Sequence, residues 1–352
     1  MASFIDFRSD TVTKPTPAML DAMMKAKIGD DVYGEDQSTN DLETRVAKLL
    51  GKDAGLFTPS GTMANQIAIH MQTLPGTSVL AEQESHVFLY EAGAASALSG
   101  IQFDLIPFES QWSNESIDMF VKPEWLHYPT TKLLVVENTH NRGSGRVLDS
   151  TSIDRIAKKG REHGLSLHCD GARLWNAAQA LKVPEIELVK PFDTVSVCFS
   201  KGLGAPVGSV LVGTKSLIDR ARKIRKRWGG GMRQVGFLTA ACHFALDHNR
   251  ERLLLDHTRV KMLHDGLMEL KELGLPIESD LPTIWTNILY FTVRKGESLQ
   301  QSGDFVASEL LADGIKLNHL GHGKLRIVTH LEISDQDIGQ LLKSLRRIIK
   351  SM

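Results

Sequence analysis

The most informative stretch of the sequence is Asp193-Thr-Val-Ser-Val-Cys-Phe-Ser-Lys201-Gly-Leu-Gly-Ala-Pro-Val-Gly208-Ser-Val-Leu-Val-Gly213. Residues 194–199 form a short β-branched and apolar run, which predicts a buried strand of an α/β sheet. Lys201 follows the run, and a loop that contains Gly202 and Gly204 leads from it to a second strand-like run at 209–212. A buried strand end makes an amine more nucleophilic, as a Schiff-base lysine requires. A lone match of this kind is more often a surface lysine at a turn. The choice between a Schiff-base lysine and a surface lysine therefore depends on the other motifs of the sequence.

Composition narrows the class of protein. The chain has 352 residues, 42% of them hydrophobic and 24% charged, as in an ordinary globular protein with one large or two moderate domains. The formal net charge of -1 gives no general attraction to nucleic acid or to a membrane surface. Cys169, Cys198 and Cys242 lie far apart without CxxC spacing, which argues against a disulfide framework or a zinc site and favours a reducing compartment.

The amino terminus carries charges at Asp6, Arg8 and Asp10, where a signal peptide would need an apolar core. No apolar run approaches the roughly 20 residues of a membrane span. We therefore expect a cytoplasmic protein with no membrane partner.

Predicted strands and helices alternate from residue 54 to 213, which favours a mostly parallel sheet covered by helices on both faces. Beyond a polar segment at 247–252, two predicted strands and two helices indicate a small α+β domain. We expect an amino-terminal arm at 1–17 that contributes to the active site, a large domain at 18–250 and a small domain at 251–352. Asn40, with Glu43 three residues on, predicts a helix start.

An anion site is predicted at Ser60-Gly61-Thr62, where a short apolar run turns directly into a helix. The first N–H groups of a helix are unpaired and lie at the positive end of its dipole, so they can bind a phosphate. Ser60 and Thr62 would add hydroxyl donors. Serine and threonine also cap ordinary helices, so this motif alone is weak evidence.

Polar residues at three further predicted strand ends are expected to lie near this anion site. His86 follows the strand near residue 80, Asp170 ends the strand 165–169, and Lys201 ends the next one. Carboxyl ends of parallel strands share one edge of a sheet. A helix N-terminus, an aspartate and a lysine at that edge are the groups needed to hold pyridoxal 5′-phosphate (PLP): phosphate site, partner of the ring nitrogen and Schiff-base lysine. His86 could instead be polar surface, and Asp170 could instead pair with Arg173.

The most basic run, residues 221–227, permits a nucleic-acid-binding alternative. The run lacks interleaved aromatic residues and the net charge is near zero, so a solvated helix face explains it better. We expect no nucleic-acid partner.

The sequence resembles the threonine aldolases over almost its full length. The motifs that carry the resemblance span residues 7–331: Phe7-Arg-Ser-Asp-Thr-Val-Thr-Lys-Pro, Gly29-Asp-Asp-Val-Tyr-Gly-Glu-Asp, Pro59-Ser-Gly-Thr-Met-Ala-Asn, Glu137-Asn-Thr-His-Asn, Asp170-Gly-Ala-Arg-Leu, Ser200-Lys-Gly-Leu-Gly-Ala-Pro-Val-Gly, Gly229-Gly-Gly-Met-Arg-Gln and Arg326-Ile-Val-Thr-His-Leu. It implies the aspartate-aminotransferase-like fold of type I PLP enzymes, with a mostly parallel seven-stranded sheet covered by helices and a small carboxyl-terminal α+β domain.

The resemblance also implies a role for individual residues. The cofactor-binding set would be Ser60, Gly61, Thr62, His86, Asp170, Arg173, Lys201 and Arg233, with Lys201 carrying PLP, His86 stacking on its ring and Arg233 coming from a neighbouring subunit. The substrate-binding set would be Ser9, His127, Arg173 and Arg326, of which Ser9 and the two arginines grip the carboxylate. His86 and His127 would flank the substrate hydroxyl, and no metal is expected.

The implied reaction is retro-aldol cleavage of L-threonine or L-allo-threonine to glycine and acetaldehyde. Other activities of the same fold, namely β-elimination, racemisation and transamination, remain alternatives. Whether His86, His127 or a water takes the hydroxyl proton stays open, as does the preference between diastereomers. A cofactor contact from Arg233 of a second copy would require a homo-oligomer, a dimer or a homotetramer built as a dimer of dimers.

Overall fold

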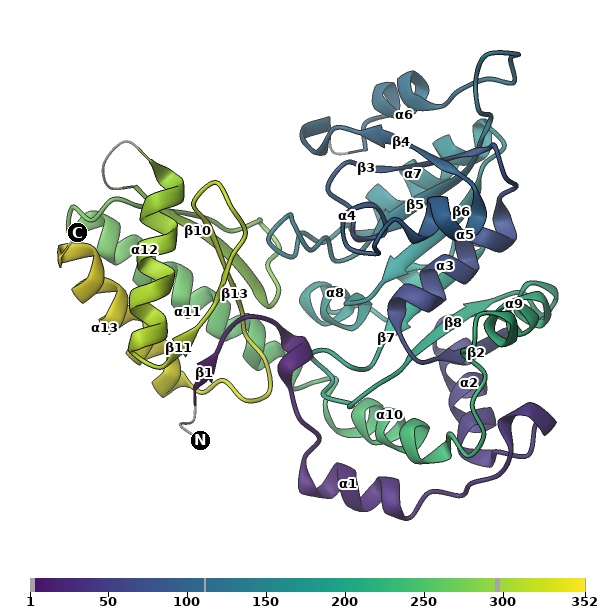
Figure 1. The fold of residues 1–352 in the computed structure, drawn as a ribbon, viewed down its shortest axis with the longest axis horizontal. Helices are drawn as coiled ribbons and strands as arrows, with labels where there is room; N and C mark the ends of the chain where they lie inside the picture. The colour runs from purple at the N-terminus through teal and green to yellow at the C-terminus, as the bar shows by residue number, and fades with distance from the viewer. Residues whose placement is uncertain (1–3, 111, 295–297, 352) are drawn as a thin grey trace.

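The computed structural model describes residues 4–110, 112–294 and 298–351. It has a large lobe built on one extended sheet and a smaller lobe beside it, and both chain ends lie in the smaller lobe (Figure 1). Among the described residues no helix is long and apolar enough to cross a membrane.

The large lobe is built on a seven-stranded sheet in the order β2-β8-β7-β6-β5-β3-β4. Neighbouring strands from β4 to β7 pair in parallel, and β8 runs antiparallel to both β7 and β2. The predicted mostly parallel seven-stranded sheet is therefore confirmed. Its strands are β2 (Ala54–Thr58), β3 (Ser78–Glu82), β4 (Gln102–Ile106), β5 (Thr131–Glu137), β6 (Ser166–Gly171), β7 (Thr194–Cys198) and β8 (Ser209–Gly213).

Ten helices belong to the described part of this lobe. They are α1 (Pro17–Met24), α2 (Gln37–Leu49), α3 (Gly61–Gln72), α4 (His86–Leu89), α5 (Ala94–Ser99), α6 (Asn114–Phe120), α7 (Ser150–Glu162), α8 (Leu174–Leu181), α9 (Lys215–Arg227) and α10 (Gly236–His248). One predicted start is wrong: α2 begins at Gln37 instead of near Asn40. Asp36 caps it, since its Oδ1 accepts from the backbone N of Thr39 at 3.0 Å.

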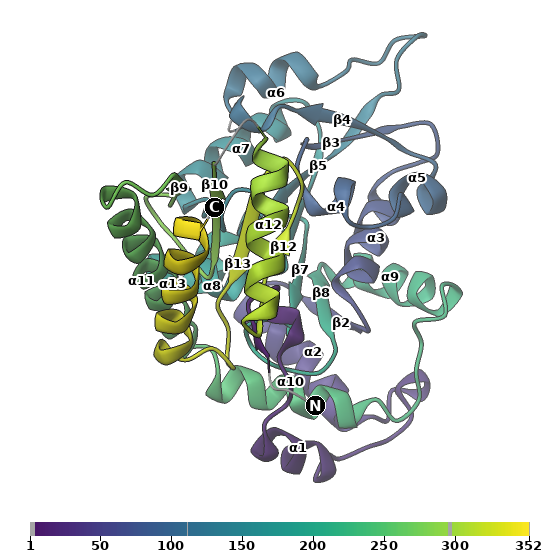
Figure 2. The ribbon, with the colours of Figure 1, turned by 60° about the vertical axis from the view of Figure 1, so that its left-hand side comes forward.

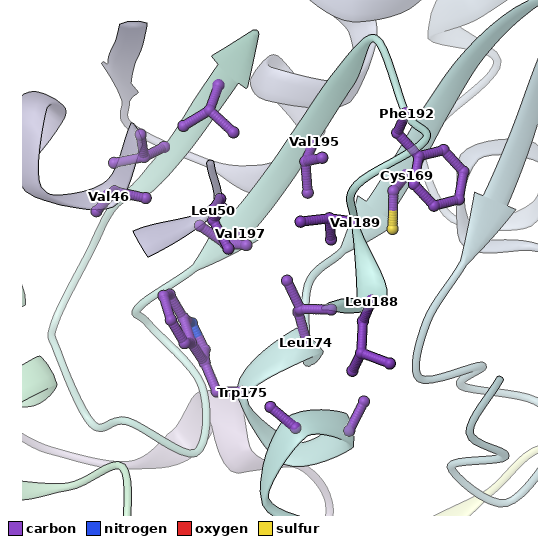
Figure 3. Close-up of a cluster of buried hydrophobic side chains, with 14 of the residues drawn as sticks. Val46, Leu50, Cys169, Leu174, Trp175, Leu188, Val189, Phe192, Val195 and Val197 are labelled. Carbon is purple, nitrogen blue, oxygen red and sulfur yellow. The ribbon is translucent and has the colours of Figure 1, made fainter. Parts of the chain in front are cut away.

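The core explains why the middle strands carry uninterrupted apolar runs. Every residue of β7 is buried, because helices cover both faces of the sheet. On one face the side chains of β6 and β7 pack against α2, α8 and the segment before β7 (Figure 3). Trp175 of α8 lies in this cluster, and its indole N–H donates to the carbonyl of Cys198 at 2.9 Å. All three cysteines are buried and free.

The small lobe contains an antiparallel sheet in the order β12-β13-β10-β9, with helices packed on one side of it (Figure 2). Its elements are α11 (Leu253–Glu272), β9 (Ile277–Asp280), β10 (Ile288–Val293), α12 (Leu299–Ala312), β11 (Ile315–Lys316), β12 (Asn318–His319), β13 (Lys324–Val328) and α13 (Asp335–Ser351). The polar segment 249–252 separates α10 from α11.

The amino-terminal segment joins the two lobes. Its strand β1 (Ile5–Asp6) pairs with β11, and Phe7 is buried in the small-lobe core. Residues 10–12 then form a single 3-10 turn before α1 packs on α10. The chain thus passes from the small lobe to the large one within its first twenty residues.

Candidate active site

A cavity of about 270 Å³ lies where β6 and β7 end and α3 begins. Its lining comes from the predicted segments far apart in the sequence: Pro59, Ser60, Gly61, Thr62, Asn65, His86, Asp170, Ala172, Cys198, Ser200, Lys201, Pro206 and Val207. Six of the predicted cofactor residues therefore share one cavity: Ser60, Gly61, Thr62, His86, Asp170 and Lys201.

The first turn of α3 forms one wall of this cavity. Ser60 is the N-cap, and its hydroxyl accepts from the backbone N of Met63 at 3.1 Å. The backbone N–H groups of Gly61 and Thr62 have no partner within the described chain and remain available to an anion. A Cβ on Gly61 would lie 2.7 Å from Sγ of Cys198, so the turn packs tightly against the end of β7.

Asp170 and Lys201 come from adjacent parallel strands. Asp170 pairs in register with Ser196 of β7, and Lys201 follows that strand by three residues. Asp170 is buried, and its carboxylate accepts from the Asn65 amide at 2.8 Å and from the backbone N of Ala172 at 3.1 Å. Lys201 is half-buried, and its carbonyl is fixed by the N–H of Gly204 at 2.8 Å.

His86 opens α4 on the same cavity. Its backbone N donates to Glu137 at 2.8 Å, and its ring Nδ1 lies 2.9 Å from Oε1 of the buried Glu91. Burial by itself would lower the pKa of His86, but the hydrogen bond to Glu91 and the charge of Asp170 outweigh it, so the pKa is raised. One carboxylate, Glu91, thus holds the ring, a second, Glu137, holds the backbone N–H of the same residue, and Nε2 is the ring nitrogen left without a carboxylate partner.

Glu137 is itself a buried acid at the end of β5. Burial, followed by the charge of Asp170, raises its pKa to about 6, although it accepts from two backbone N–H groups. Three buried carboxylates, Asp170, Glu91 and Glu137, therefore lie around His86, and of these Asp170 is in the cavity lining.

The three residues expected to bind a substrate carboxylate lie outside this lining. Arg173 is buried and donates through Nε and one Nη to both carboxylate oxygens of Asp10, at 2.8 and 2.7 Å. The partner of Arg173 is thus Asp10, and the considered pairing with Asp170 is wrong. The Ser9 hydroxyl caps the 3-10 turn by accepting from the backbone N of Thr11.

Arg326 lies on β13, where it donates to the side chain of Asn141 at 3.1 Å and to the carbonyl of Arg8 at 2.9 Å. Its Nε is buried without a hydrogen-bond partner among the described residues, and its register partner on β10 is Tyr290. A buried guanidinium N–H without a partner is suited to an anionic ligand.

A larger cleft of about 550 Å³ lies between the lobes and has Tyr290 in its wall. Arg142, Arg146 and Lys324 contribute positive charge to it, and Glu278 is the acid among its described lining residues. Its described lining includes no helix N-terminus, and its lysine, Lys324, begins β13 of the small sheet instead of following a strand of the large one, so the smaller cavity is the better cofactor site.

His127 and Arg233 do not reach the cavity of their own chain. His127 is exposed in the loop between α6 and β5, which projects from the large lobe in Figure 1. The side chain of Arg233 is 58% exposed and pairs with Asp30 at 3.1 Å. Neither lines the cavity.

The sequence did not single out Glu91, Asn65 or Asp10 for a role. Asn65 lies one turn after Gly61 on α3, so its spacing could have placed it over the same site. Glu91 and Asp10 carry no local signal, because their partners are brought near by the fold.

The residues of the cavity fit PLP. Free N–H groups at the helix N-terminus suit its phosphate, the buried Asp170 suits its ring nitrogen, and Lys201 provides the amine. His86, Glu91 and Asp170 also place three ligand atoms within 4.8 Å of one another, as a metal site would. Hydrogen bonds from Asn65 and His86 already join these groups.

Comparisons with known proteins give the family. A family profile described as Beta-eliminating lyase matches residues 6–285. The chain is 38% identical to low-specificity L-threonine aldolase 1 of Arabidopsis thaliana, over 99% of this chain and 97% of that protein. It is 39% identical to low specificity L-threonine aldolase of Escherichia coli K12, over 96% and 97% of the two chains. The chain belongs to the threonine aldolase family.

The solved structures agree on the fold. The threonine aldolase of Leishmania major superposes with a TM-score of 0.82 at 21% identity, covering 98% of this chain and 99% of that one. Serine palmitoyltransferase of Sphingomonas wittichii gives 0.76 at 17% identity, covering 99% and 88%. This threonine aldolase family member has the fold of type I PLP enzymes and is a PLP-dependent lyase.

Proposed function

We propose that the protein cleaves L-threonine or L-allo-threonine, and related L-β-hydroxy-α-amino acids, to glycine and an aldehyde such as acetaldehyde. The observation that carries this proposal is the single cavity shared by Lys201, Asp170, His86 and the α3 N-terminus, in a chain whose curated relatives are low-specificity L-threonine aldolases. When bound, PLP supplies the electron sink for the pair released from the Cα–Cβ bond.

Different residues of the chain would bind the cofactor and the substrate. The free N–H groups of Gly61 and Thr62 would bind the phosphate, and Asp170 would keep a proton on the ring nitrogen. Arg326 and Arg173, with Ser9, would hold the substrate carboxylate and so orient the bond that breaks. His86, His127 or a water would take the hydroxyl proton. The unspent Nε of Arg326 supports its place in the carboxylate site.

The decisive assay uses L-allo-threonine and L-threonine with PLP-loaded protein. Acetaldehyde and glycine in equal amounts are expected. The Beta-eliminating lyase profile favours one alternative, β-elimination, which would give 2-oxobutyrate from threonine instead. Lys201→Ala should abolish turnover and the visible absorbance of lysine-bound cofactor. A colourless wild-type protein that PLP cannot reconstitute would overturn the proposal.

The carboxylate site has its own test. Arg326→Lys keeps the charge but loses the planar fork, so KM should rise about 10- to 100-fold, the equivalent of 1.5–3 kcal/mol for a charged hydrogen bond. Cofactor absorbance should stay unchanged. An unaltered KM would remove Arg326 from the substrate site.

We also propose a homo-oligomer, a dimer or a tetramer, whose subunits share active sites. Arg233 and His127 lie outside the cavity of their own chain, and both have exposed apolar neighbours: Ile28, Val32, Tyr33 and Phe237 near Arg233, Trp125, Leu126 and Tyr128 around His127. The N–H of Asp31 donates to the carbonyl of Arg233, which ties that arginine to the 28–33 segment. Exposed apolar patches of this kind mark interaction surfaces.

Mixed subunits test this arrangement. Lys201→Ala and Arg233→Ala proteins should each be inactive, but unfolding and refolding them together should restore about a quarter of wild-type activity, because half of random dimers pair one intact site with one dead one. Absence of any recovery, with dimers confirmed by light scattering, would place Arg233 in its own subunit.

A cytoplasmic location belongs to this proposal and is supported by the three free cysteines.

A further inference from the structure

The hydrogen-bond partners of Asn65 fix the orientation of its side-chain amide. Its Oδ1 accepts from the Ser196 hydroxyl at 2.6 Å and faces Nε2 of His168 at 3.1 Å. Its amide group donates to both Asp170 and Glu91, at 2.8 and 2.9 Å. The reverse orientation would set the amide oxygen against two carboxylates, which can only accept when ionised. Asn65 therefore bridges Asp170 and Glu91 with its two amide protons.

The same Oε1 of Glu91 that accepts from Asn65 also faces the ring of His86. The carboxylate is 2% exposed and also accepts from the Gln66 amide at 2.5 Å. An ionised carboxylate has no proton to give, so the Nδ1 of His86 facing it must carry one. The Nε2 atom is then the ring nitrogen left to meet a ligand in the cavity, which His86 lines.

We propose that Glu91 is a positioning residue of this active site: it fixes His86 as the Nδ1–H tautomer, with Nε2 toward the cofactor and substrate, and is coupled to Asp170 through Asn65. The inference deepens the proposed function and rests on it for its catalytic consequence. The tautomer itself follows from the hydrogen bonds alone.

The electrostatic surroundings give the inference a measurable consequence. His86 is faced by Glu91 from the α4–α5 segment, Glu137 from β5, Asp170 from β6 and Lys201 after β7. Glu91 is the only one of these within hydrogen-bond distance of its ring. Neutralising Glu91 should therefore lower the pKa of His86 more than loss of a distant carboxylate would.

Glu91→Gln is a suitable variant because the site can accommodate an amide. The Oε1 of Gln66 is buried without a partner among the residues described. If Gln66 turns its amide, this oxygen can accept from the new amide group at position 91. The variant then removes the charge and keeps the shape. Glu43→Gln is the matched control, since Glu43 is also buried but bonds to Phe57 and Arg222.

The experiment measures His86 directly in the full-length protein before cofactor or substrate is added. Diethyl pyrocarbonate modifies only unprotonated imidazole, so the pH dependence of His86 modification, followed by peptide mass spectrometry, reports its pKa. The midpoint should move to lower pH in Glu91→Gln and stay in place in Glu43→Gln. An unmoved midpoint in Glu91→Gln would overturn the proposal.

A second measurement needs only wild-type protein and remains decisive if Glu91→Gln does not fold. Nitrogen-15 shifts of labelled histidine, recorded above the pKa of His86 and assigned with His86→Asn, should show the neutral ring protonated at Nδ1; a neutral ring protonated at Nε2 would refute the inference. In the PLP-loaded enzyme the acidic limb of the kcat profile should shift in the same direction in Glu91→Gln. In the His86→Asn background, Glu91→Gln should no longer shift this limb. If Glu91 had a merely structural role, its replacement would change the kcat profile in that background as well. An inactive wild type with the expected tautomer would count against the proposed function only.

Discussion

At the scale of single residues, the first turn of α3 shows how closely the cofactor site is packed. Gly61 contributes a free N–H to the cavity, and its Cα approaches Cys198 so closely that a Cβ would meet Sγ at 2.7 Å. Cys198 is buried at the end of β7, where its Sγ accepts from the Ser209 hydroxyl at 3.2 Å. Glycine at this position is therefore required by packing as well as by access to an anion.

Gly61→Ala should destabilise the protein by about 1–3 kcal/mol, as overpacking of a buried site does, and should weaken PLP binding. Denaturant unfolding and cofactor titration measure the two effects. Cys198→Ala removes the obstructing sulfur, so the double variant should regain much of the stability lost by Gly61→Ala. Equal losses in both backgrounds would show that the sulfur is not the cause.

At the scale of elements, the contact between β6 and β7 sets the distance between Asp170 and Lys201. Gly171 ends β6, and a Cβ there would lie 2.8 Å from the backbone carbonyl of Ser196 in β7. A backbone atom of a central strand cannot yield as a side chain can. The glycine therefore permits the two strands to carry their polar ends side by side.

Gly171→Ala should separate these strands, lower the midpoint of unfolding and reduce the fraction of protein that retains PLP absorbance. The control is Gly339→Ala in α13, where nothing lies within 4 Å of the added Cβ. That change should stabilise the protein by about 1 kcal/mol, since alanine is the better helix former. Equal behaviour of the two variants would contradict the packing argument.

At the scale of the whole molecule, one carboxylate joins three parts of the chain. Asp10 of the amino-terminal segment is fully buried, pairs with Arg173 after β6 and accepts from Asn287 before β10 at 3.0 Å. Burial would raise the pKa of Asp10, but the charge and hydrogen bonds of Arg173, the charge of Lys201 and the bond from Asn287 lower it overall. The relative placement of arm, large lobe and small lobe thus depends on an ionised Asp10.

Asp10→Asn should cost about 3–5 kcal/mol, because it leaves Arg173 buried without its counter-charge. The sign of the pH effect follows from the lowered pKa. The ionised form is favoured in the folded state, so its stabilisation is present above the unfolded pKa near 4 and is lost as the pH falls below it. The stability difference between wild type and Asp10→Asn should therefore shrink between pH 6 and pH 3 in urea unfolding. A constant difference would indicate a steric cause.

Local sequence patterns were enough to predict the large sheet and the main segments that line the cavity. Apolar runs predict the strands at 165–169 and 194–199, and parallel strands bring their carboxyl ends to one edge, so Asp170 and Lys201 had to be neighbours. The helix start at Asn40 was wrong because Asp36, four residues earlier, offered an equally good cap, and a choice between caps depends on what the preceding loop contacts.

The sequence by itself therefore predicted the fold class, the PLP-dependent class of enzyme and six residues that share one cavity, since each of these residues follows a strand or opens a helix within a few positions of a recognisable pattern: Ser60, Gly61, Thr62, His86, Asp170 and Lys201. Only the tertiary structure decided that Arg173 pairs with Asp10, that Glu91 holds His86, and that His127 and Arg233 lie outside the cavity of their own chain. Asp10 and Arg173 are 163 residues apart. Contacts between such distant segments depend on how whole elements pack, which no local periodicity encodes.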